Sequence, residues 1–116
     1  AIADQLSFHR IGAHPGFADR ENFGRREQPL TPPEAAELVL RQIGHLQDIA
    51  ANAGTLVHHV KLHGALYNQV SRDGALAEAV VGAIRTTGEN PMIYALAGSE
   101  LERVARQCRG LVVVSE

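Results

Sequence analysis

The segment from His14 to Glu27, HPGFADRENFGRRE, gathers side chains that can move protons and bind anions. His14 can exchange a proton near neutral pH, and Asp19 can act as a base or orient one. Arg25 and Arg26 offer planar N–H donors that suit a carboxylate or a phosphoryl oxygen. The segment is therefore predicted to be a catalytic and substrate-binding loop, with pairing of Asp19 to the arginines as the structural alternative.

A second segment, HHVKLHGALYN from His58 to Asn68, brings a cation, an imidazole and an amide into one short stretch. Lys61 is the only lysine beside ten arginines, which favours a site where a compact ammonium stabilises oxyanion charge. His63 is predicted to transfer a proton, and Asn68 and Gly64 to bind substrate, since glycine admits a close backbone approach. Pairing of Lys61 with a carboxylate at the rim of the fold is the structural alternative.

Four further side chains are interpreted mainly as structural. His58 and His59 fall in one expected strand and should point to opposite faces, so at least one of them should pack. Tyr67 fits a core position and a rim position equally well. Cys108 has apolar neighbours and is interpreted as a core residue, not as a nucleophile.

The short motifs of several enzyme classes are absent from the sequence. It contains no Cys-x-x-Cys, no His-Glu-x-x-His and no serine nucleophile elbow, and it lacks the Gly-x-x-x-x-Gly-Lys loop of P-loop kinases. His14 and His63 follow separate expected strands, which is a weak metal signal because no short ligand spacing supports it. Whether the site holds a divalent metal is therefore left undecided by the sequence.

Expected strands and helices alternate along the chain, and they must position both loops. Four apolar runs are predicted as strands: 9–13, 56–60, 92–97 and 111–114. Helices are expected over about 31–54, 71–87 and 99–108, with capping boxes at Thr31 and Ser99, and residues 62–70 are expected to be a loop. This α/β pattern is typical of parallel β-α units. Because ligands bind at the carboxyl ends of such strands, the two loops should converge there.

Length and composition limit the organisation and the partners. The 116 residues are 45% hydrophobic, with 4% aromatics and a net charge of −2. One domain over residues 1–116 is expected, and its four strands amount to about half of a closed barrel of ~250 residues, with an open sheet as the alternative. No basic stripe and no long apolar run is present, so neither nucleic acid nor a membrane is expected as a partner. The lone Cys108 favours the cytoplasm.

Both chemical segments resemble the LamB/YcsF family. IGAHPGFADRENFGRR, residues 11–26, is similar to that family's IGAHPGYPDxxGFGRR, and HVKLHGALYN, residues 59–68, is similar to HVKPHGALYN. A Gln-Ile-Gly helix around Gln42 lies between them, as in the family. Leu62 stands where the family usually has proline, and Asn22 where it usually has glycine.

The resemblance implies a seven-stranded β/α barrel of the glycoside hydrolase/deacetylase type. It also implies the A subunit of an ATP-dependent 5-oxoprolinase, which opens 5-oxo-L-proline (pyroglutamate) to L-glutamate with ATP as cofactor and subunits B and C as partners. A homo-oligomer is left open. Further family motifs would precede Ala1 and follow Glu116, so the chain is expected to be an internal part of a longer domain and inactive or unstable alone.

Two other functions remain open on the sequence. A metal-dependent amidohydrolase or carbohydrate deacetylase could use the same barrel, and it would lose activity on chelation instead of requiring ATP. A truncated domain that only packs or binds is the non-catalytic alternative.

Overall fold

The computed structural model describes residues 11–17 and 27–116, which form one parallel sheet with helices packed on it. The strands are β1 (Ile11–Ala13), β2 (Val57–Val60), β3 (Met92–Ala95) and β4 (Val113–Ser115). They lie in the order β1-β2-β3-β4, and every neighbouring pair is parallel. The prediction of four parallel strands is confirmed, although the observed strands begin or end up to two residues away from the expected bounds. Residues 9 and 10 of the first expected strand lie outside the described residues.

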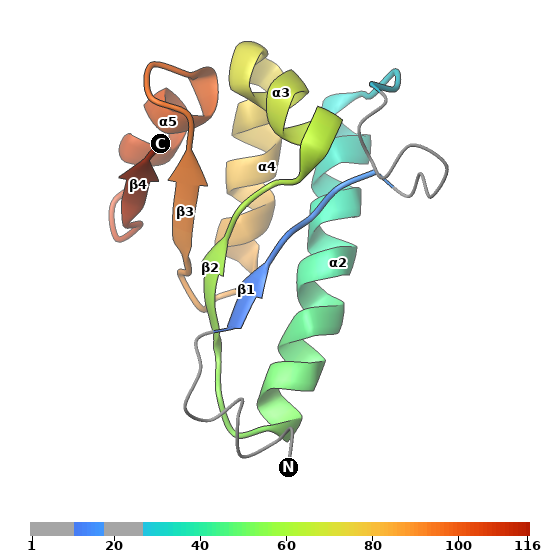
Figure 1. The fold of residues 1–116 in the computed structure, drawn as a ribbon, viewed down its shortest axis with the longest axis vertical. Helices are drawn as coiled ribbons and strands as arrows, with labels where there is room; N and C mark the ends of the chain where they lie inside the picture. The colour runs from blue at the N-terminus through green and yellow to red at the C-terminus, as the bar shows by residue number, and fades with distance from the viewer. Residues whose placement is uncertain (1–10, 18–26) are drawn as a thin grey trace.

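Four helices accompany the sheet in the described part of the chain: α2 (Pro32–Asn52), α3 (Gly64–Arg72), α4 (Gly74–Thr86) and α5 (Glu100–Arg106). Figure 1 shows α4 behind β2 and β3, α2 along the side of β1, and α3 at the end of β2. The fully buried core includes Val39 and Ile43 of α2, Val80 and Ile84 of α4, and Ile93 of β3. The predicted α/β class is confirmed, because four parallel strands alternate with helices along the described chain.

The start of α2 matches its sequence signal closely. The Thr31 hydroxyl accepts the Glu34 N–H at 3.3 Å, and the Glu34 carboxylate accepts the Thr31 N–H at 3.0 Å. At α5 only half of the expected box forms, because Ser99 accepts the Glu102 N–H at 3.1 Å while the Glu102 carboxylate accepts from Gly98. None of the helices in the described part of the chain is long and apolar enough to cross a bilayer.

The helix α3 corrects the prediction of a loop over residues 62–70. Leu66 and Val70 are four positions apart and fully buried, which is the helical spacing of an apolar stripe. The expected single helix over 71–87 is divided, because the Asp73 carboxylate accepts the N–H groups of Ala75 and Leu76 and begins α4 there. The prediction of a loop was therefore wrong for residues 64–70, which belong to α3.

The strand β2 contains an irregularity that affects both of its histidines. Ile11 pairs with Val57 but Gly12 pairs with His59, so the extra residue His58 forms a β-bulge. Val57 and Val60 are both buried, while both histidines are half-buried. The strict alternation expected for His58 and His59 is therefore broken, and their Nδ1 atoms lie 3.0 Å apart.

Candidate functional site

The two predicted loops lie side by side at the carboxyl ends of β1 and β2. The Lys61 N–H donates to the Ala13 carbonyl at 2.9 Å, and the His63 N–H donates to the Pro15 carbonyl at 2.7 Å. A Cβ added at Gly16 would lie 3.2 Å from the Cβ of His63, so the loop backbone touches that residue. The predicted convergence of the loops is confirmed where the structure describes them.

Aromatic rings extend from the first loop across the sheet. The rings of His14 and His59 meet edge to face with centroids 6.1 Å apart, and His59 meets Tyr94 of β3 at 5.3 Å. His59 covers Gly12 so closely that an added Cβ would lie 1.9 Å from its Nε2. His59 and Tyr94 were not predicted as site residues, because the pairing of His59 with Gly12 is known only from the structure.

Lys61 is held by a carboxylate that comes from the far end of the described chain. Its Nζ lies 2.9 Å from Oε2 of Glu116, and the Tyr67 hydroxyl donates to Oε1 of the same carboxylate at 2.9 Å. The Lys61 and Glu116 side chains are 44% and 30% exposed. The ion pair considered as the structural alternative for Lys61 is therefore present. Tyr67 takes a half-buried position at the rim, and Glu116, 55 residues from Lys61 in sequence, was not predicted as a site residue.

The contacts of Glu116 shift the pKa values of two groups in opposite directions. Burial, together with the hydrogen bond and charge of Glu116, raises the pKa of Tyr67 to about 12. The hydrogen bond from Lys61, then the one from Tyr67 and the Lys61 charge, lower the pKa of Glu116. The contribution of Tyr67 to the free energy of unfolding is therefore complete below its ordinary pKa, and it is lost as the pH rises towards about 12. Stability from Glu116 is present above its ordinary pKa and lost as pH falls through its lowered one.

A tyrosinate absorbance titration should detect the Glu116 cluster, which consists of Lys61, Tyr67 and Glu116. In the full-length protein, the transition that disappears in Tyr67→Phe should lie near pH 12, and Glu116→Gln should move it down towards the ordinary 10. Part of the shift should remain in Glu116→Gln, because burial is unchanged. Circular dichroism at each pH serves as the control for folding. A Tyr67 transition that Glu116→Gln leaves in place would contradict the hydrogen bond.

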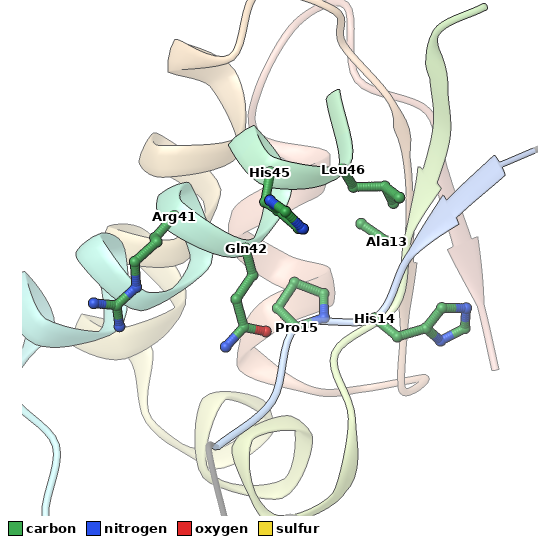
Figure 2. A pocket seen from close by; sticks show the side chains of 7 residues that line it. All are labelled: Ala13, His14, Pro15, Arg41, Gln42, His45 and Leu46. Carbon is green, nitrogen blue, oxygen red and sulfur yellow. The ribbon is translucent and has the colours of Figure 1, made fainter. Parts of the chain in front are cut away.

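A cavity of about 440 Å³ lies between β1 and α2. Its lining residues are Ala13, His14, Pro15, Arg41, Gln42, His45 and Leu46. Figure 2 shows the His14 ring turned away from the α2 side chains, in keeping with its contact to His59. Gln42 reaches from α2 to the Gly16 backbone, where it accepts the N–H at 3.0 Å and donates to the carbonyl at 2.8 Å.

The remaining predicted site residues fall into two groups. Gly64 begins α3 with a φ of +61°, a conformation that favours glycine, and Asn68 is exposed on the same helix. Asp19, Arg25 and Arg26 lie outside the described residues, so their roles stay predictions. Within residues 11–17 and 27–116, no group of three or more His, Cys, Asp or Glu side chains is arranged to hold a metal ion.

Comparison with known proteins gives one family. The model of the LamB/YcsF family matches residues 5–116. The A subunit of 5-oxoprolinase from Bordetella pertussis (strain Tohama I) is 48% identical over 96 residues, 83% of this chain. The proteins of that name from Brevibacillus brevis and Heliobacterium modesticaldum are 48% and 49% identical over 106 residues, 91% of this chain.

A solved structure agrees with these sequence matches. The crystal structure of the lactam utilization protein from Thermus thermophilus matches with a TM-score of 0.86 and 39% identity, over 98% of this chain and 48% of that one. The chain spans only 38% to 41% of the length of the three curated relatives.

Proposed function

Because this chain belongs to the LamB/YcsF family, we propose that it is part of the A subunit of an ATP-dependent 5-oxoprolinase. The substrate is 5-oxo-L-proline, whose lactam is opened to L-glutamate, and the partners are subunits B and C. The observation that carries this proposal is the 48% identity, over most of the chain, to proteins named as the A subunit of 5-oxoprolinase. A cytoplasmic location belongs to the proposal, because the single cysteine allows no internal disulfide.

The residues beside the two loops suit the opening of a cyclic amide. Attack on the lactam carbonyl develops negative charge on its oxygen, and the Lys61 ammonium at the end of β2 can stabilise that charge. His14 and His63 can move the proton between the attacking group and the leaving nitrogen. The assignment of proton transfer to His14 and His63 is supported by the backbone contacts that bring these two histidines to adjoining loops.

The other proposed groups bind the substrate or orient a base. Asp19 serves as a base or orients one. Arg25 and Arg26 bind a carboxylate or phosphoryl oxygen, and Gly64 and Asn68 contact the substrate. ATP supplies the free energy for opening a stable five-membered lactam. Among the residues that the structure describes, the Lys61 ammonium suits a phosphoryl oxygen as a point charge.

The decisive experiment is an assay of the full-length protein with subunits B and C. We expect release of phosphate and L-glutamate together, only when both ATP and 5-oxoproline are present. Each component is omitted in turn as a control. Amide hydrolysis without ATP, lost after removal of a bound metal, would instead support the metal-dependent amidohydrolase or deacetylase. Binding of the partners without any turnover would support the non-catalytic alternative.

A further inference from the structure

The side chain of Gln42 connects α2 to the first loop through both ends of its amide. Its Oε1 accepts the Gly16 N–H at 3.0 Å, and its Nε2 donates to the Gly16 carbonyl at 2.8 Å. These two bonds fix both the position and the orientation of a residue 26 places earlier in the chain. A side chain that only filled space between helix and loop would not need both polar groups.

The residue that Gln42 holds lies against the second loop. Gly16 is two positions after His14, and an added Cβ there would lie 3.2 Å from His63 Cβ and 3.3 Å from its carbonyl oxygen. The preceding carbonyl, of Pro15, accepts the His63 N–H at 2.7 Å. The backbone of Pro15 and Gly16, which directly follows His14, is thus held by Gln42 on one side and by His63 of the second loop on the other.

Two other glutamines make a comparison possible. Gln69 of α3 bonds to Gln28 in the same two-bond manner, at 3.2 Å and 2.9 Å, and so holds the later part of the same loop. Gln47 lies on α2 with Gln42 but bonds instead to the Thr87 carbonyl at 3.3 Å and to Glu89 at 2.7 Å, in the connection between α4 and β3. That connection precedes β3 and therefore lies at the opposite end of the sheet from the site.

We propose that Gln42 is a positioning residue for the site, and this inference rests on the proposed function. It fixes the peptide of Gly16 so that His14 and His63 keep the relative placement that proton transfer needs. Gln42 does not contact the reacting atoms in this arrangement. It acts through the backbone of the loop, because small misplacements of catalytic groups reduce rates strongly.

The test compares Gln42→Met with Gln47→Met in the full-length protein, assayed with subunits B and C. Both variants remove the same amide from the same helix, so similar modest losses of melting temperature are expected. Gln42→Met should lower kcat about tenfold, with KM for 5-oxoproline changed much less, because alignment and not binding is lost. Gln47→Met should keep kcat within about twofold of the unmodified protein. Equal kcat values in the two variants would overturn the inference.

A second measurement keeps this test separate from the proposed function. If the unmodified complex shows no 5-oxoproline-dependent ATP hydrolysis, the proposed function fails, and amide hydrogen exchange in the full-length protein decides the inference. Gln42→Met should speed exchange of the Gly16 and His63 amides, while Gln47→Met should leave them unchanged. Unchanged exchange at both amides in Gln42→Met would show that Gln42 does not position the loop.

Discussion

The full-length protein carrying Lys61→Arg is expected to fold normally and to lose most of its lactam-opening activity, roughly a hundredfold or more in kcat. The physical reason is that a compact ammonium approaches a developing oxyanion as a point charge, whereas a guanidinium is larger, planar and differently hydrated. An ammonium has three N–H donors, and Glu116 accepts one of them at 2.9 Å. Steady-state kinetics with subunits B and C, together with a melting curve, measures the effect.

The ion pair with Glu116 makes this experiment decisive. If that pair is the whole role of Lys61, arginine can replace it at a cost of only ~0–1 kcal/mol, as for other exposed pairs, and activity should stay nearly complete. Arg72→Lys is a matched control, because Arg72 forms an exposed ion pair with Glu27 and the exchange runs in the opposite direction. Near-normal kcat in Lys61→Arg would refute the oxyanion role.

Leu66→Ala is expected to give the largest loss of stability, about 2–5 kcal/mol in the free energy of unfolding. Leu66 is fully buried, and its helix packs on both α4 and α5. Alanine is a better helix former than leucine, so the loss would come from the cavity and the lost apolar burial, not from the backbone. Urea unfolding of the full-length protein, followed by circular dichroism, gives the difference.

The control for Leu66→Ala is Leu40→Ala on α2. Leu40 is 39% exposed, so the same change of side chain should cost less than about 1 kcal/mol. Leu66→Ala should also reduce activity, because α3 begins directly after His63 and supplies Tyr67 to the Glu116 cluster. Equal losses of stability in the two variants would mean that α3 is not part of the cooperative core.

The sequence predicted those parts of the fold that local chemistry determines. The capping box at Thr31 lies within four residues, and the alternation of apolar strands and helices was sufficient for the parallel sheet. The helix α3 was missed because Gly64 and Asn68 are common in turns, whereas the burial of Leu66 and Val70 depends on tertiary packing. Local signals alone could not weigh that packing.

The candidate site was predictable to the extent that it follows strand ends. His14, Lys61 and His63 each follow β1 or β2, and parallel pairing brings those ends together. Glu116 could not be predicted in this way, because it meets Lys61 across the intervening strand β3. The bulge at His58 was equally hidden, since a β-strand pattern gives no sign of an extra residue before its register with a neighbour is known.

The close contact between Gly12 and His59 has a consequence for how this sequence can change during evolution. The imidazole occupies the space that any side chain at position 12 would need, with its Nε2 only 1.9 Å from the site of a Cβ. The two positions therefore compete for a single volume. A substitution that enlarges residue 12 therefore requires either that the His59 ring turn away, with loss of its contacts to His14 and Tyr94, or that residue 59 become smaller.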